Sequence, residues 1–394
     1  MTGIISLVFM PIRSAHFLKL FIITRLMTTP IVVVSGFLGA GKTSLVQHLL
    51  NTGDRKIGLL VNDVGRINID ASLIKRETVD HEGFKMVQVE NGCACCSASD
   101  DLYVSIRKLM TMGSFDVIVI ECSGVAEPKR LFSNLDAAFE EEGISDKVAM
   151  SHVVTVVDCQ QFMNNLTTNK EGDSQRFVSD LLAEQLEAAD LILVNKTDRV
   201  TIDEVARVSD VIQSMNPTSR ILQSAHSRVP VRDVLVFDDP STSAALLSTD
   251  EEHRIATKKR KLSSVQTYVY QRRRPFNAVL FEKYVIKEAP LWFRSCILRS
   301  KGFCWFADRM DMAFYFSQTG MHTSLSHSGA WWGDVPRSCW PLDDVKEIEV
   351  DFEGFFDDRR QELVFIGLGF VEKDVDQLFD KCLLSLEETL VLEK

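Results

Sequence analysis

Residues 31–43 read IVVVSGFLGAGKT and join a run of apolar residues to a glycine-rich turn. The turn matches the pattern G-x-x-x-x-G-K-[ST], and the residues after it, Thr43 to Asn51, are readable as a helix. Glycines let a backbone curl around phosphates, Lys42 would reach the β and γ phosphates, and Thr43 would offer its hydroxyl to Mg²⁺. The stretch therefore predicts a phosphate-binding loop, with a simple glycine-rich turn as the alternative. The predicted loop consists of Gly36, Phe37, Leu38, Gly39, Ala40, Gly41, Lys42 and Thr43.

Short apolar runs recur through the first half of the chain. They occupy residues 31–34, 57–61, 117–120, 153–157 and 191–194. Stretches readable as helices lie between them, at 43–51, 100–112 and 178–189. Nearly every position in the runs is apolar, as expected for strands covered on both faces. The alternation predicts an α/β fold with a doubly wound, mostly parallel sheet, whose ligands bind at the carboxyl ends of the strands.

The length of 394 residues fits two domains better than one core. We expect a possible transit or optional segment at residues 1–26, a P-loop domain at 27–237, a linker at 238–264 and a smaller α+β domain at 265–394. In the last part, residues 265–271 and 347–352 are predicted as strands of an antiparallel sheet. The apolar residues between Val371 and Cys382 fall on one face of a predicted helix.

Composition excludes some classes of function. The net charge of −11 and the pI near 5.3 argue against a nucleic-acid partner, and we interpret the basic run at 258–261 as a solvated linker rather than a nuclear address. No apolar run is long enough to predict a membrane span. Nine cysteines, three of them within four residues, indicate a reducing compartment. We expect a cytoplasmic protein, with a mitochondrial location as the alternative because residues 1–26 contain no acidic residue.

The choice of nucleotide base depends on the stretch Asn195-Lys196-Thr197-Asp198, which follows the apolar run at 191–194. An aspartate carboxylate accepts hydrogen bonds from N1 and the 2-amino group of guanine. Adenine instead presents an acceptor at N1, which would leave a buried carboxylate unsatisfied. GTP is therefore predicted over ATP, and a surface turn is the alternative.

The apolar run at 117–120 leads into Glu121-Cys122-Ser123-Gly124. Glu121 stands where a ligand of Mg²⁺ or its water, or a group that orients water, is needed. Gly124 stands where a backbone amide could sense the γ-phosphate. An ordinary strand end is the alternative interpretation.

The sequence Cys93-Ala94-Cys95-Cys96 packs three thiolates into one turn. Thiolates select zinc and similar ions, and this pattern does not separate zinc from cobalt or nickel. Three ligands leave a tetrahedron open, and a fourth must come from a carboxylate, a histidine, water or a partner, which suits a site that releases its metal. Buried cysteines or a redox pair are the alternatives.

Together these motifs resemble the CobW-type metallochaperone GTPases of the G3E class over about residues 31–390. Arg274-Pro275-Phe276, Arg299-Ser300-Lys301-Gly302 and Trp331-Trp332-Gly333 look like the CobW carboxy-terminal domain. The resemblance implies hydrolysis of GTP coupled to transfer of a metal to a client metalloprotein, which the sequence does not identify.

The resemblance also bears on single residues. It implies a Cys96 that touches both the metal and the nucleotide. After the second apolar run, where family members usually carry a stretch like NEFGE, this chain has Asn62-Asp63-Val64-Gly65-Arg66. Asp63 keeps one carboxylate and is a catalytic candidate with Lys42, Thr43 and Glu121, whereas Arg66 replaces the other. Two further alternatives are a small-molecule kinase and a regulatory GTPase whose cysteine cluster is only structural.

Overall fold

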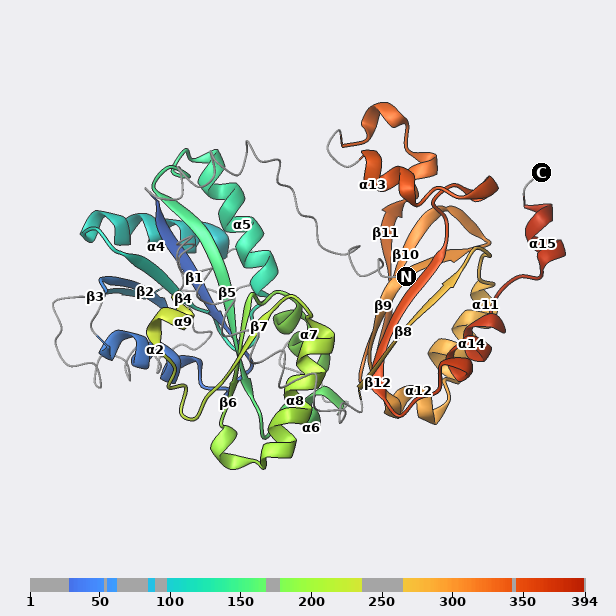
Figure 1. The fold of residues 1–394 in the computed structure, drawn as a ribbon. Coiled ribbons are helices and arrows are strands. Elements are labelled where there is room, and N and C mark those ends of the chain that lie inside the picture. Colours follow the sequence, from blue (N-terminus) through green and yellow to red (C-terminus); the bar gives the residue numbers. More distant parts are fainter. Residues whose placement is uncertain are drawn as a thin grey trace.

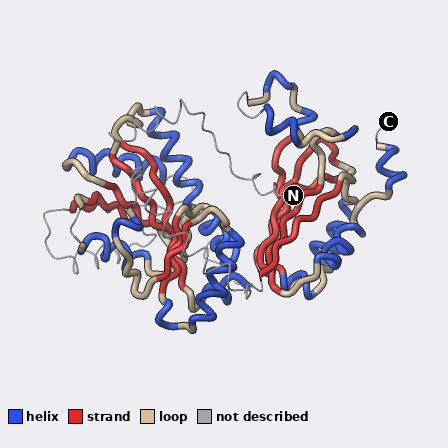
Figure 2. The backbone as a smooth tube through the Cα atoms, viewed as in Figure 1, coloured by secondary structure: helices blue, strands red, loops and turns tan. Residues whose placement is uncertain are grey.

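The computed structural model describes residues 28–52, 55–61, 84–88, 98–167, 178–235, 265–341 and 345–392. These residues form two β-sheets, one in each half of the chain, with helices packed against both (Figures 1 and 2). The predicted segment 1–26 and the predicted linker lie outside the described residues. Within the described part of the chain, no helix is long and apolar enough to cross a membrane.

The first sheet has seven strands in the order β3-β2-β4-β1-β5-β6-β7, and all of its pairings are parallel. Its strands are β1 (Thr29–Ser35), β2 (Ile57–Val61), β3 (Phe84–Gln88), β4 (Val117–Glu121), β5 (Val148–Asp158), β6 (Leu191–Asn195) and β7 (Arg220–Gln223). Its helices are α2 (Lys42–Asn51), α4 (Ala98–Met112), α5 (Pro128–Glu141), α6 (Phe162–Thr167), α7 (Val178–Glu187), α8 (Ile202–Met215) and α9 (Val231–Val234). The predicted doubly wound α/β fold is confirmed.

The central strand β1 explains why its sequence is apolar at consecutive positions. Val32 and Val34 pack into a core with α2 and α9, whereas Ile31 and Val33 pack into a second core with α4 and α5. Side chains alternate between the two faces of a strand, and helices cover both faces here. A strand buried on both sides has no solvent-facing position for a polar residue.

The second sheet has five strands in the order β11-β10-β9-β12-β8, and all of its pairings are antiparallel. Its strands are β8 (Val265–Arg272), β9 (Ile297–Phe306), β10 (Arg309–Thr319), β11 (His322–Ala330) and β12 (Gln361–Leu368). The helices of this half are α11 (Ala278–Phe281), α12 (Leu291–Cys296), α13 (Val345–Val350), α14 (Glu372–Asp380) and α15 (Leu386–Val391). One face of the sheet packs on α11, α12 and α14 through an aromatic core that includes Phe281, Phe293 and Phe379.

The strand predicted at 347–352 is wrong, because this segment forms helix α13 up to Val350. The sequence EIEVDF at 347–352 alternates polar and apolar residues like a strand, but Val345 and Ile348 are also three residues apart, on one side of a helix. Ile348 is buried and Val350 is exposed, as the helical spacing requires. The helix predicted near residues 371–382 is confirmed as α14.

The other face of the second sheet contacts the first half of the chain. Leu298 of β9 and Ile366 of β12 belong to the same buried cluster as residues of β5, β6 and α6 to α8. In Figure 1, α6, α7 and α8 accordingly lie between the two sheets. The two halves therefore share an apolar interface.

Candidate functional site

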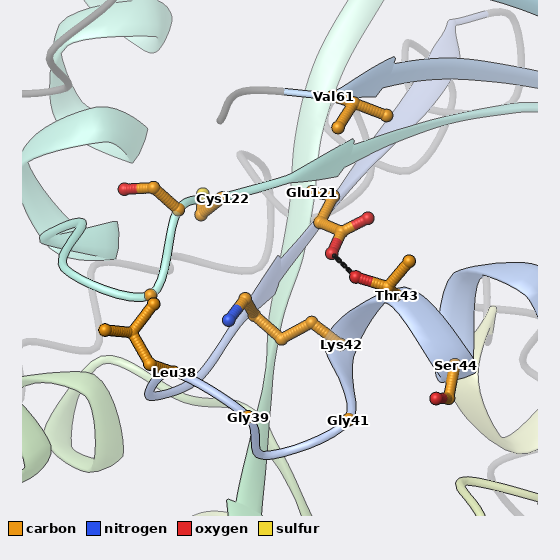
Figure 3. Close-up of a pocket in the computed structure, with 11 residues that line it drawn as sticks. Leu38, Gly39, Gly41, Lys42, Thr43, Ser44, Val61, Glu121 and Cys122 are labelled. Atoms are coloured by element: carbon orange, nitrogen blue, oxygen red, sulfur yellow. Dashed lines mark hydrogen bonds between the residues drawn. The ribbon is translucent and has the colours of Figure 1, made fainter. Parts of the chain in front are cut away.

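The predicted phosphate loop connects β1 to α2 and borders a pocket of roughly 270 Å³ (Figure 3). Leu38, Gly39, Gly41, Lys42 and Thr43 line the pocket. The other three residues of the predicted loop are not among its lining residues, although Phe37 accepts a hydrogen bond through its backbone oxygen from Lys42 Nζ at 3.3 Å. The loop thus curls around a concave site at the amino end of a helix, which is favourable for anions.

Gly41 caps α2 with a φ of 113°, a conformation that side chains disfavour. A Cβ atom at this position would also lie 2.4 Å from Asn195 Nδ2 and 2.8 Å from Ser227 Oγ. The loop therefore passes close to β6 and to the turn around Ser227 only because residue 41 is glycine.

Lys42, Thr43 and Glu121 come together at the pocket (Figure 3). Thr43 Oγ1 donates a hydrogen bond to Glu121 Oε1 at 2.7 Å. Glu121 is the last residue of β4 and only 2% of its surface is exposed, while the Lys42 ammonium lies in the same pocket. A hydroxyl and a carboxylate oxygen in contact are the kind of donors that Mg²⁺ prefers, so the residues present fit this ion.

Four pocket residues were not singled out from the sequence as site residues: Ser44, Val61, Cys122 and Ser123. Burial raises the pKa of the Cys122 thiol to about 12, against the opposing effect of the Lys42 ammonium. Cys122 is therefore a protonated, apolar part of the wall at neutral pH and a poor metal ligand. Its position directly after Glu121 was the only signal in the sequence.

Asn195 connects three segments. Its Nδ2 group donates to the Ala40 oxygen and to Ser227 Oγ, each at 2.9 Å. Its Oδ1 atom accepts from Ser224 Oγ at 3.0 Å and from the Ser227 amide at 2.8 Å. The buried asparagine thus holds the phosphate loop, the end of β6 and the turn 224–227 in one arrangement.

The rest of the predicted base-binding stretch lies beside the same turn. Lys196 has a φ of 61° and pairs with Asp158 at 2.6 Å, and Thr197 Oγ1 donates to the Ser224 oxygen at 3.0 Å. The Asp198 carboxylate is partly exposed and lies 3.8 Å from His226 Nε2. Sequence analysis missed the turn Ser224-Ala225-His226-Ser227, which no local pattern marks.

The cysteine cluster at 93–96, Asp63 and Arg66 lie outside the described residues. The elements that flank the cysteines are described. Gln88, the last residue of β3, pairs in register with Val61, and Val61 pairs with Glu121. Residue 89 therefore follows a strand that ends at the same edge of the sheet as two pocket residues.

Comparison with known proteins agrees with this architecture. The family model described as "CobW/HypB/UreG, nucleotide-binding domain" matches residues 30–223, and the model described as "Cobalamin synthesis protein cobW C-terminal domain" matches residues 265–383. Zinc-regulated GTPase metalloprotein activator 1 of Dictyostelium discoideum is 32% identical over 389 residues, which cover 92% of this chain and 81% of that protein.

Two further similarities are more limited. The zinc chaperone CobW of Pseudomonas aeruginosa is 29% identical over 221 residues, covering 51% of this chain and 58% of that protein. A crystal structure of the Zn(II)-bound YjiA GTPase from E. coli is 19% identical with a TM-score of 0.38, covering 90% of this chain and 99% of that one. The two family models and the Dictyostelium relative suffice to show that the chain belongs to the family that carries a CobW/HypB/UreG nucleotide-binding domain followed by a CobW C-terminal domain.

Proposed function

We propose that this protein hydrolyses GTP with the help of Mg²⁺ and uses the reaction to deliver zinc to a client metalloprotein. The observation that carries the proposal is the contact between Thr43 and Glu121 beside Lys42, at the mouth of a glycine-rich loop. Membership of the family and the names of the zinc-related relatives agree with it.

The roles of the pocket residues follow from their chemistry. The backbone amides from Gly36 to Thr43 and the Lys42 ammonium would bind the phosphates, and Thr43 and Glu121 would hold Mg²⁺, which supplies neutralisation of charge on the β and γ phosphates. Glu121 would also orient water, and we keep Asp63 as a further catalytic candidate. Because Glu121 is buried at the pocket wall, bulk water has little access to it beyond the pocket, and charges act more strongly there.

Guanine would be recognised by the stretch that follows β6. Asp198 would accept hydrogen bonds from N1 and the 2-amino group, and Lys196, held by Asp158, would flank the base. The turn around Ser224 supports this assignment because Ser224 forms hydrogen bonds with both Thr197 and Asn195.

Zinc would bind as cargo to Cys93, Cys95 and Cys96, with cobalt or nickel as alternatives. The register of the sheet supports a location near the nucleotide, because residue 89 follows a strand that ends beside Val61. Cys96 would then lie close enough to respond to the nucleotide. The client protein stays unidentified, and both the cytoplasmic location and the mitochondrial alternative stay predictions.

The nucleotide assignment can be tested with two variants. Lys42→Ala should abolish GTP binding, because the phosphates lose their cation. Asp198→Asn should shift preference from guanine to xanthine nucleotides, because the amide donates to the C2 carbonyl of xanthine. Titration with fluorescent GTP and XTP measures both effects, and unchanged GTP affinity in both variants would exclude this site.

The metal assignment needs a separate test. If zinc and GTP bind next to each other, each must change the affinity of the other by the same factor, typically about 5- to 150-fold. Zinc titrations with and without a nonhydrolysable GTP analogue, and the reverse titrations, measure this factor. Serine at all three cysteines should remove the coupling and leave GTP binding intact. Two flat titrations in the wild type would instead support a regulatory GTPase with a structural cluster.

A further inference from the structure

Helix α7 contacts both the pocket wall and the second sheet. Gln185 makes the contact with the pocket wall, and Glu187, two residues later, makes a contact with the second sheet. We propose that α7 transmits the nucleotide state of the loop at Gly124 to the carboxy-terminal domain, with Gln185 as the positioning residue on the pocket side and Glu187 as the link on the other. The inference rests on the proposed function, because it requires that GTP bind at the pocket.

On the pocket side, Gln185 Nε2 donates to the backbone oxygens of Gly124 and Ala126, each at 3.2 Å. Gln185 is only 1% exposed, so water cannot readily replace these bonds. The backbone oxygen of Gln185 in turn accepts a hydrogen bond from Thr155 Oγ1 on β5 at 2.9 Å. The loop after β4 is therefore fastened to α7, and α7 is fastened to the sheet.

Gly124 is also in contact with the phosphate loop. A Cβ atom on Gly124 would lie 2.8 Å from the backbone nitrogen of Leu38 and 2.6 Å from its side chain. Both residues line the pocket. Gly124 thus lies between the phosphate loop and Gln185, and a displacement of its peptide toward a γ-phosphate would change the distance to Gln185.

On the other side, Glu187 Oε1 lies 2.9 Å from Arg299 Nε and 3.3 Å from Lys301 Nζ, both on β9. Arg299 is 5% exposed, and its guanidinium also donates to Ser317 Oγ at 2.7 Å and to Thr319 Oγ1 at 3.1 Å on β10. A buried guanidinium with one carboxylate partner is costly to leave unpaired. Because of this ion pair, a movement of the end of α7 should move β9 and β10 with it.

The first turn of α7 makes a second attachment to the same sheet. Ser179 Oγ donates to the Thr319 oxygen at 3.2 Å, and Asp180 pairs with His322. A helix of ten residues is about 15 Å long, so the two attachments hold α7 at both ends. Between these two attachments, Leu186 of α7 packs in the same buried cluster as Leu298 and Ile366 of the second sheet.

These contacts form a continuous path from the pocket to the second sheet. Closely packed interiors move as units rather than deform continuously, so a shift at Gly124 is passed on by α7. The position of β9 and of the turn after β10 should then differ between the states with and without γ-phosphate. Arg299 and Lys301, which the sequence indicates only as part of the stretch Arg299-Ser300-Lys301-Gly302, would thus link β9 to α7 through Glu187.

The test follows backbone hydrogen exchange of residues 297–306 and 316–322 in the full-length protein with GDP or a nonhydrolysable GTP analogue. In the wild type the exchange rates at this interface should differ by about fivefold or more between the two nucleotides. Gln185→Met keeps the volume but removes the donor, and it should reduce the difference to less than about twofold. Gln213→Met is the matched control, because Gln213 is exposed on the next helix and bonds only to backbone oxygens nearby.

A second variant tests the other end of the path. Glu187→Gln keeps the shape but removes the charge that pairs with Arg299, and it should also abolish the nucleotide-dependent difference. By linkage, it should change the ratio of affinities for the GTP analogue and GDP, although Glu187 does not line the pocket. This ratio is a readout that simple loss of stability would not move.

The outcomes separate this inference from the proposed function. If the wild type binds the analogue but exchange at the interface is the same in both nucleotide states, coupling through α7 is refuted and GTP hydrolysis is untouched. A difference that persists in Gln185→Met and in Glu187→Gln also refutes it. If the wild type binds no GTP analogue at all, the proposed function fails, and this inference fails with it.

Discussion

Replacing Asn195 by alanine should destabilise the protein and weaken nucleotide binding together. The side chain is 2% exposed and makes four hydrogen bonds. Its loss would leave the Ala40 oxygen, the Ser227 amide and the Ser224 hydroxyl without this partner. A buried group that loses its partner costs about 1 to 3 kcal/mol, and water entering the void would relieve part of it. We therefore expect a loss of about 3 to 5 kcal/mol in the free energy of unfolding.

The matched control is Asn216→Ala. Asn216 is equally buried and also makes four hydrogen bonds at its side chain, to Leu186, Ala189, Thr218 and Ser219, but none of them involves the pocket. Both variants should lose a similar amount of stability, as measured by denaturation followed by circular dichroism. Of these two variants, only Asn195→Ala should weaken GTP binding, by about tenfold or more, because Asn195, unlike Asn216, donates to the phosphate loop.

Unfolding of the two halves of the chain can be followed by different signals. All five tryptophans lie between residues 292 and 340, so tryptophan fluorescence follows the carboxy-terminal domain whereas circular dichroism follows the whole chain. The reasoning is refuted if Asn195→Ala loses less than about 1 kcal/mol. It is equally refuted if Asn216→Ala weakens GTP binding as much as Asn195→Ala does.

Three further predictions follow from the geometry. Thr43→Ala should lower Mg²⁺-dependent GTP turnover by about tenfold or more while Thr43→Ser retains most of it, because only the hydroxyl contacts Glu121; steady-state phosphate release measures this. Cys122 should resist alkylation at neutral pH until the protein unfolds, since burial raises its pKa to about 12; peptide mapping after labelling would show early modification if this is wrong. Burial raises the pKa of Glu187, but Arg299 and Lys301 outweigh this effect and hold the pKa below the ordinary value of a glutamate. Relative to Glu187→Gln, the stabilisation by Glu187 should therefore be complete above about pH 4.5 and be lost as the pH falls through the lowered pKa. Urea unfolding of both proteins across this range tests this, and a difference in free energy of unfolding that does not change with pH would contradict it.

The central strands were predictable because they are covered on both faces and their sequences are continuously apolar. The two edge strands, β3 and β7, were missed for the opposite reason. The sequence FKMVQ of β3 mixes polar and apolar residues, and β7 is only partly buried, so neither has the pattern of an inner strand. The error at 347–352 has a different cause, since a segment of six residues with three apolar positions is too short for its pattern to distinguish a strand from a helix.

The residues of the candidate site also differ in whether the sequence predicts them. The phosphate loop and the stretch at 195–198 are contiguous, so that spacing alone predicts them. Gln185 and the turn at 224–227 act through partners that are 59 or more and 27 or more residues away, and no local pattern marks such contacts. Burial of Gln185 is a property of the packed helix, which appears only in three dimensions.

The position of β1 in the middle of its sheet has a consequence for how the protein is made. Its two neighbours, β4 and β5, lie more than 80 residues later in the chain, and Asn195 follows Ser35 by about 160 residues. At about 5 to 20 residues per second, the ribosome needs roughly 8 to 30 seconds to complete that interval. Until β4 is made, which takes about half of this interval, the strongly apolar β1 has no partner strand, and until Asn195 is made the GTP site that would stabilise the following loop is incomplete. This strand order therefore leaves β1 unpaired early in synthesis, at a stage when nucleotide binding cannot yet protect it.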